Sequence, residues 1–493
     1  MNTTSAGTGR LRGWIAVGAA AVLVAAVGVG GHFLPAQQAE KAAAGQPLVG
    51  RTTSVCTTGT LNSGNGSDST ESQVYGVSAK TGSGKDGSLV GRELGTTDSG
   101  NPALSVTTQG EGKIVSAPKN AVELTADGIM ASSSAGMVYG ISDTGEDRGL
   151  SLGPCATPAV DQWFTGLGAT DELRSQLVLT NPDDKQAEVD LDFYGPKGSL
   201  SVPGGSGLLI PAGRSRTLSL PDLLGKVSGS ITIHVHASIG RISAMARDLR
   251  TEDSGNPSGV DWHPASTAAS TSQIIPAVPG GPGSRQLSIS NTSDRRAKVK
   301  IEILGPQGPF TPVGTSQVDV GAHSATTVDV AKGLAQQIGT VRVTSDQPVL
   351  TSIRSERPGS SKPNDIAVET SQPAINGTGI APAAVVDGSE TELAISNGGT
   401  GSTTVRVQLF NLDGVSLYDE KIPIVGGASI ERRVTQAGPA YLVVAAPEGS
   451  QVYGGITLRQ QTGDVYGLAS AALITPALAG SARTSEINPH VAQ

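Results

Sequence analysis

Apolar and polar residues alternate with a period of two in short segments of this chain, and three of these segments resemble one another. Segments 177–198, 287–308 and 393–414 each contain an apolar run, an alternating stretch and a glycine-containing turn. Such alternation is typical of antiparallel strands with one face in a core and the other in water. Because Gly and Pro supply the backbone angles of tight turns, the pattern predicts short strands joined by hairpins.

An asparagine marks the same position in each of the three segments. Asn181, Asn291 and Asn397 end the apolar runs, and each is followed by a valine eight positions later and a glycine seventeen positions later. We take these asparagines as the signature of the repeat. Pro-Ala steps recur at intervals of about 100 residues, which is the size of one sandwich domain.

The repeat predicts an all-β fold made of tandem immunoglobulin-like β-sandwich modules after an N-terminal transmembrane helix. A propeller-like closed array is the alternative, for which blades of about 40–50 residues are expected. The predicted parts of the chain are a cytoplasmic n-region (1–13), a transmembrane anchor (14–34), a linker (35–50), a divergent β-module with a disulfide (51–158), β-sandwich repeats (159–275, 276–381 and 382–480) and a disordered tail (481–493).

The anchor is predicted from an uncharged apolar run between Trp14 and Leu34, which follows Arg10 and Arg12. About 20 apolar residues span a bilayer as a helix, and positive charge before the helix keeps the N-terminus in the cytoplasm. We therefore expect a single-pass protein of the cell membrane with its C-terminal ectodomain outside the cytoplasm. The alternative is secretion after signal-peptide cleavage near residues 42–44.

Composition and charge limit the chemistry that the ectodomain is expected to perform. The chain has 66 glycines, 3% aromatic residues and a net charge of −8. It lacks a long basic block, so nucleic acid is not an expected partner, because duplex binders need clustered Lys and Arg. Its two cysteines, Cys56 and Cys155, predict one disulfide in an oxidising compartment.

The histidines do not predict a catalytic or metal site. His234 and His236 alternate with apolar residues, which places them on the outward face of a strand. Such a pair can bind a metal, but no third ligand stands near it in the sequence. No catalytic residue, metal ligand or cofactor is predicted.

The large aromatic residues have two interpretations. Trp163, Phe164 and Trp262 either pack the module joints or form a platform for a ligand, and packing is favoured in a chain this poor in aromatic residues. Exposed tryptophans in a groove would favour glycan binding, whereas buried ones would favour a structural or interaction role.

A family resemblance rests on several motifs in combination. These are the Cys-Ala-Thr-Pro at 155–158, the Trp-Phe-Thr-Gly at 163–166, the run 177–182, the Tyr-Gly-Pro-Lys-Gly at 194–198 and the segment 259–265. Together they resemble an uncharacterised family of actinobacterial membrane-anchored secreted proteins, a domain of unknown function. The resemblance implies export and repeats, and it implies no active site.

The function expected from the sequence is that of a non-catalytic, membrane-anchored extracytoplasmic protein of the cell envelope with a structural or protein-interaction role. Its expected partners are the membrane, through the N-terminal helix, and envelope proteins or cell-wall glycan. A glycan-binding or glycan-active cell-wall protein is the alternative.

Overall fold

The structure is a computed structural model that describes residues 50–58, 71–80, 86–96, 102–312, 317–358 and 365–476. All of these residues belong to one unit, Leu48–Ala479. The expected n-region, transmembrane anchor and C-terminal tail lie outside the described residues, as does the linker apart from Gly50. In the part of the chain that is described, no helix has the length and apolar character needed to cross a bilayer.

The described unit is almost entirely β-structure, which confirms the predicted all-β class. Its helical elements are single short turns, namely η1 (Ile129–Ser132), α2 (Leu220–Leu224) and α3 (Ala331–Leu334). The strands form four blades, each of which contains two layers of β-sheet.

The first blade consists of two four-stranded sheets with the orders β1-β6-β3-β4 and β5-β2-β7-β8. Its strands are β1 (Arg51–Cys56), β2 (Glu71–Ser78), β3 (Gly87–Glu93), β4 (Leu104–Val106), β5 (Gly112–Ser116), β6 (Val122–Gly128), β7 (Ser134–Ser142) and β8 (Gly149–Pro154). The predicted disulfide is present, since the sulfurs of Cys56 and Cys155 are 2.01 Å apart. It joins the end of β1 to the residue that follows β8 and lies within the core of this blade.

The second blade is a nine-stranded sheet with the main order β12-β11-β15-β9-β10-β16-β17. Its strands are β9 (Asp161–Ala169), β10 (Leu173–Asn181), β11 (Ala187–Gly195), β12 (Gly198–Leu200), β13 (Leu208–Ile210), β14 (Arg214–Ser219), β15 (Val227–Ile239), β16 (Ser243–Thr251) and β17 (Pro257–His263). β9 and β10 pair at a single position, Ala169 with Arg174. The sheet therefore has two halves, which face each other across a core of aliphatic side chains.

The third blade has the main order β21-β20-β24-β19-β23. Its strands are β18 (Ser270–Val278), β19 (Arg285–Asn291), β20 (Ala297–Gly305), β21 (Gly308–Phe310), β22 (Val318–Val320), β23 (Ser324–Asp329), β24 (Gly339–Arg357) and β25 (Asp365–Thr370). The long strand β24 takes part in both halves, because it pairs with β20 and β18 as well as with β19 and β25.

The fourth blade consists of sheets with the orders β26-β31-β28-β29 and β30-β27-β32-β33. Its strands are β26 (Thr378–Val385), β27 (Ser389–Asn397), β28 (Thr403–Asn411), β29 (Ser416–Ile424), β30 (Ser429–Val434), β31 (Ala440–Ala445), β32 (Val452–Thr462) and β33 (Val465–Ala472).

The apolar residues of the period-two pattern face the core, as hydrophobic burial requires. In β11, Val189, Leu191 and Phe193 are buried, whereas Asp192 is exposed. Burying each of these apolar side chains contributes about 1.5–3 kcal/mol relative to exposing it. A shift of register by one residue would move the whole apolar set into water, so the pattern fixes the pairing of β11.

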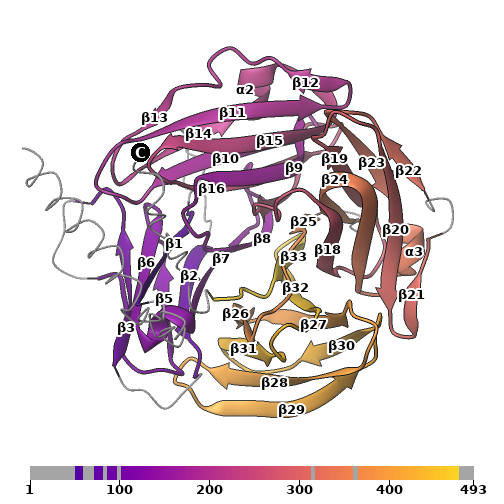
Figure 1. Ribbon diagram of the computed structural model, residues 1–493. Helices are drawn as coiled ribbons and strands as arrows, with labels where there is room; N and C mark the ends of the chain where they lie inside the picture. Colours follow the sequence, from indigo (N-terminus) through magenta and orange to yellow (C-terminus); the bar gives the residue numbers. More distant parts are fainter. Residues whose placement is uncertain are drawn as a thin grey trace, which may run out of the picture. The chain divides into compact units, whose positions relative to one another are not determined.

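The four blades close into a propeller-like arrangement (Figure 1). The inner strand of each blade (β8, β17, β25 or β33) contacts the inner strands of its two neighbours. This is the alternative that the sequence left open, and the immunoglobulin-like sandwich order is not confirmed. The blades are longer than the expected 40–50 residues because each contains two sheet layers.

Candidate functional site

Two buried carboxylates lie where the inner strands meet. Oδ1 of Asp261 on β17 accepts the backbone N–H of Leu152 on β8 at 2.9 Å, and Oδ2 accepts that of Val368 on β25 at 2.9 Å. Oδ2 of Asp365 accepts the N–H groups of Leu150 on β8 at 3.0 Å and Leu468 on β33 at 2.7 Å. The two aspartates therefore connect backbones from all four blades.

Burial controls the ionisation of these central groups. It raises the pKa of Asp365 to about 8, and the backbone N–H groups of Leu150 and Leu468 oppose this shift. Burial likewise raises the pKa of Asp261 well above its usual range. The oxygens of both aspartates accept hydrogen bonds from backbone N–H groups. The two buried carboxyl groups therefore hold the inner strands together and are not presented to a substrate.

A third buried carboxylate, Glu369 on β25, borders a small cavity of about 180 Å³ whose lining includes Pro154, Pro264 and Pro373. Oε2 of Glu369 accepts a hydrogen bond from the Ser355 hydroxyl at 3.0 Å, whereas Oε1 has no hydrogen-bond partner among the residues that the structure describes. Burial raises the pKa of Glu369 to about 8, against the opposing charge of Arg285.

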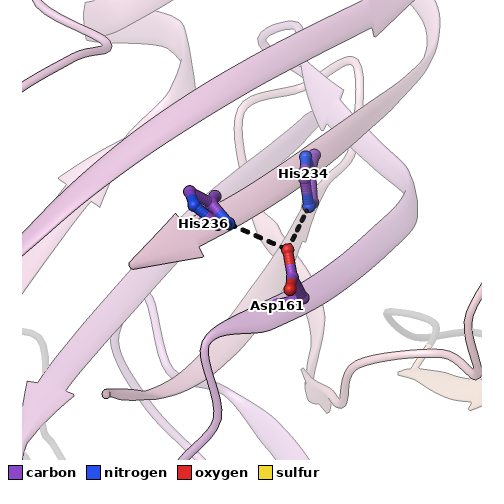
Figure 2. Close-up of side chains that lie close together, drawn as sticks. All are labelled: Asp161, His234 and His236. Atoms are coloured by element: carbon purple, nitrogen blue, oxygen red, sulfur yellow. Dashed lines mark hydrogen bonds and ion pairs between the residues drawn. The ribbon is translucent and has the colours of Figure 1, made fainter. Parts of the chain in front are cut away.

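A cluster of ionisable side chains lies on strands β9 and β15 of the second blade (Figure 2). Oδ1 of Asp161 lies 3.0 Å from Nε2 of His234 and 2.9 Å from Nδ1 of His236. Hydrogen bonds from His236 and His234 lower the pKa of Asp161. The imidazole of His234 is 18% exposed, whereas His236 and Asp161 are 47% and 53% exposed, so the cluster is open to solvent.

The register of the sheet explains why these side chains meet. On β15, His236 is paired with Asp161 of β9, and His234 is paired with Trp163 of β9. On the other side of β15, His234 is paired with Asp192 of β11. Directly paired residues of antiparallel strands have Cβ atoms about 4.5–5.5 Å apart, so their side chains come into contact.

Aromatic rings extend the cluster along the surface. The Trp163 ring stacks on the His234 imidazole, with centroids 4.0 Å apart and an interplanar angle of 8°. Tyr194 lies 6.1 Å from Trp163, and His323 of the third blade lies 6.2 Å from Tyr194. Few aromatic residues are present in this chain, and this row brings several rings to one place.

An open groove of about 680 Å³ lies between the second and third blades. Its lining contains charged groups of both signs, including Asp171, Lys226, Arg250, Arg354 and Glu356.

Arg354 also connects the two blades that border this groove. Its Nη2 lies 3.3 Å from Oδ2 of the buried Asp248 on β16. Burial opposes the charge of Asp248, but Arg354 and His263 lower its pKa to about 2. An ion pair between blades therefore fixes one wall of the groove.

The three predicted aromatic residues have different environments. Phe164 is fully buried and Trp262 is 4% exposed. Trp163 is partly exposed and belongs to the row of rings described above. Phe164 belongs to the core of the second blade, and Trp262 packs with Val178 and Met245.

The signature asparagines share one set of contacts, which is structural. The Asn181 amide nitrogen donates to the carbonyl oxygens of Lys185 at 2.7 Å and Ile210 at 2.9 Å, and its side-chain oxygen accepts the N–H of Asp183 at 3.0 Å. Asn291 and Asn397 make the equivalent bonds. Each asparagine therefore holds the turn that leads to the next strand.

Sequence reasoning noted the histidine pair and missed Asp161 as its neighbour. The chain separation between Asp161 and His236 is 75 residues, and only the pairing of β9 with β15 brings them together. The available signal in the sequence was the outward-facing histidine pair itself.

Comparison with known proteins places the chain in a family. A profile of the Family of unknown function (DUF5719) matches residues 106–435. The chain belongs to this family. The expected resemblance to a family without an assigned function is confirmed to that extent, whereas the actinobacterial source and the membrane anchoring stay expectations.

Other comparisons add little to the DUF5719 assignment. No curated protein is a significant match. Among solved structures, one described as "Crystal Structure of Thermotoga maritima 1070" is 16% identical and has a TM-score of 0.19. The match covers 22% of this chain and 96% of that chain. A TM-score this low does not indicate a shared fold.

Proposed function

We propose that this protein is a non-catalytic, membrane-anchored extracytoplasmic protein of the cell envelope that acts as an interaction scaffold. The observation that carries the proposal is the polar groove between the second and third blades, which has a volume of about 680 Å³ and a lining of charged groups of both signs. Such a lining suits an extended polar segment of a protein partner, because complementary charges contribute specificity and a faster association rate.

Two further observations support the proposal. The central carboxylates are occupied by backbone N–H groups from several blades, which favours a structural role for them. The disulfide favours an oxidising compartment outside the cytoplasm. The apolar run between Trp14 and Leu34 supplies the anchor in this proposal, and the actinobacterial envelope is the compartment that the family resemblance suggests.

Site-specific photo-cross-linking in intact host cells tests the scaffold. A photoreactive residue at Thr327, which is exposed in the groove, is expected to give one discrete adduct with an envelope protein. The matched control places the same residue at Leu417, which is 38% exposed on the fourth blade. If Thr327 gives no adduct beyond that of Leu417, the groove does not bind a partner and the scaffold proposal fails.

Glycan binding is the second candidate, and one observation favours it. Trp163 is partly exposed and lies next to Tyr194, so a sugar ring would find an aromatic surface there. Soluble cell-wall fragments are expected to bind the wild-type protein and not Trp163→Ala. Equal binding by both proteins would exclude this surface as a glycan site.

A further inference from the structure

We propose that Asp161, His234 and His236 form a binding site for a transition-metal ion of the Zn²⁺ class. The ligand atoms are one carboxylate oxygen of Asp161, Nε2 of His234 and Nδ1 of His236. These atoms all lie within 4.8 Å of one another. The site goes beyond the proposed scaffold function and does not depend on it.

The two separations from the Asp161 oxygen need only small changes to accept an ion, and the two histidine nitrogens, which lie within 4.8 Å of each other, must reach the same tetrahedral spacing. Ligands about 2.0–2.1 Å from a tetrahedral Zn²⁺ lie about 3.3 Å apart. The Asp161 oxygen lies 3.0 Å from His234 Nε2 and 2.9 Å from His236 Nδ1, so each separation must open by a few tenths of an ångström. The partly exposed side chains of Asp161 and His236 have room to do this by rotating toward solvent.

The surroundings of His234 are those of a metal-ligating histidine. Its second ring nitrogen, Nδ1, lies 3.3 Å from Oδ2 of Asp192. A ligating histidine usually donates its other N–H to a carboxylate, which fixes the tautomer and increases the basicity of the ligand. Trp163 stacks on the same ring at 4.0 Å and fixes its plane.

The donor set selects the class of ion. Two imidazole nitrogens and one carboxylate suit Zn²⁺ and neighbouring transition metals, whereas Ca²⁺ and Mg²⁺ require several oxygen ligands. Three protein ligands leave a fourth tetrahedral position for water or for a group on a partner. The competing explanation is a hydrogen-bonded cluster in which Asp161 accepts N–H bonds from both histidines.

Binding of Zn²⁺ alone to the full chain separates the two explanations. The purified protein carries no histidine tag, is stripped with a chelator and is titrated with Zn²⁺ by calorimetry. One equivalent is expected to bind to the wild type, and binding is expected to be lost in His234→Gln and His236→Gln. Asp192→Asn removes the carboxylate beside Nδ1 of His234 and is expected to weaken binding about 10–100-fold.

The matched control is His323→Gln, because this imidazole pairs with Asp294 at 2.7 Å and is not one of the three proposed ligands. It is expected to bind Zn²⁺ as the wild type does. If the wild type binds no Zn²⁺, or if both histidine variants bind as it does, the proposal is overturned and any remaining binding is adventitious.

A second measurement remains informative if a ligand variant folds poorly. Cu²⁺ bound at this site would quench the fluorescence of Trp163, which stacks on a ligand. Trp163→Phe keeps all three ligands and is expected to bind Cu²⁺ with most of the quenching lost. Unchanged quenching in Trp163→Phe would place the ion elsewhere and overturn the proposal.

Discussion

At the scale of single residues, asparagine closes the same turn in each repeat through hydrogen bonds that an aliphatic side chain cannot make. The buried amide of Asn291 donates to the carbonyl oxygens of Arg295 at 2.6 Å and Val320 at 3.2 Å, and its oxygen accepts the N–H of Ser293 at 3.0 Å. Asparagine supplies both donors and acceptors on a short side chain, which suits it to closing such turns.

Replacing Asn291 by alanine is therefore expected to destabilise the protein. The substitution leaves buried backbone groups without partners, and each such group costs about 1–3 kcal/mol. The free energy of unfolding, measured by chemical denaturation, should fall by at least about 1–3 kcal/mol, the cost of one unpaired buried group. Asn256→Ala is the control, because Asn256 is exposed and its side-chain amide donates to the Ser254 hydroxyl rather than to buried backbone groups, and its effect should stay within about 0.5 kcal/mol. Equal effects of the two substitutions would show that the signature has no structural role.

At the scale of strands, the sequence predicted where the strands lie in the chain better than it predicted which strands pair with one another. The alternation in β11 determines which residues face the core, and Val189 and Leu191 are buried as expected. Strand partners distant in the chain were not visible, because pairing depends on how sheets close in space. The candidate metal site illustrates this, since Asp161 on β9 meets His236 on β15 only through the sheet register.

The disulfide is an element-scale constraint on the first blade. Beside it, the backbones of Val55 and Ala156 exchange hydrogen bonds of 2.8 and 2.9 Å. β8, which ends just before Cys155, supplies the N–H groups of Leu150 and Leu152 to the central aspartates. The bond therefore connects the two sheets of the first blade, because it joins the edge strand β1 of one sheet to the residue after the inner strand β8 of the other.

Changing both cysteines to serine is expected to lower the free energy of unfolding, by up to about 4.7 kcal/mol for a closed loop of about 100 residues. Limited proteolysis should then cut the first blade before the others. Thiol labelling of the denatured wild type, with and without reductant, checks the bond directly. Labelling of both cysteines without reductant would contradict the bond.

At the scale of the whole described unit, the blades depend on one another. The sequence repeat indicated how many similar modules to expect. It did not indicate that the inner strands of these modules contact one another. That contact is set by Asp261 and Asp365, whose oxygens accept N–H groups from neighbouring blades. The ring also covers the inner edge of each blade, because the inner strands contact one another there, whereas separate sandwiches would leave those edges exposed.

The buried carboxylates make the stability of this ring depend on pH. Glu369 has a pKa of about 8 in the folded protein because it is buried, and an unfolded glutamate has a pKa of about 4.3. Between these values the folded protein holds a proton that the unfolded chain releases. The stabilisation is therefore fully present below about pH 4 and is lost as the pH rises to about 8, at up to about 1.4 kcal/mol per pH unit.

The Glu369→Gln variant isolates this contribution, because glutamine has the shape of the protonated acid and does not titrate. The free energy of unfolding of the wild type should fall between pH 5.5 and pH 8.5, and the variant should show a shallower fall. Asp365, whose pKa is also about 8, keeps part of the slope in both proteins. Denaturation curves at the two pH values measure the difference. Identical slopes would mean that Glu369 is ionised in the folded protein at neutral pH, and that the cavity beside it solvates the charge.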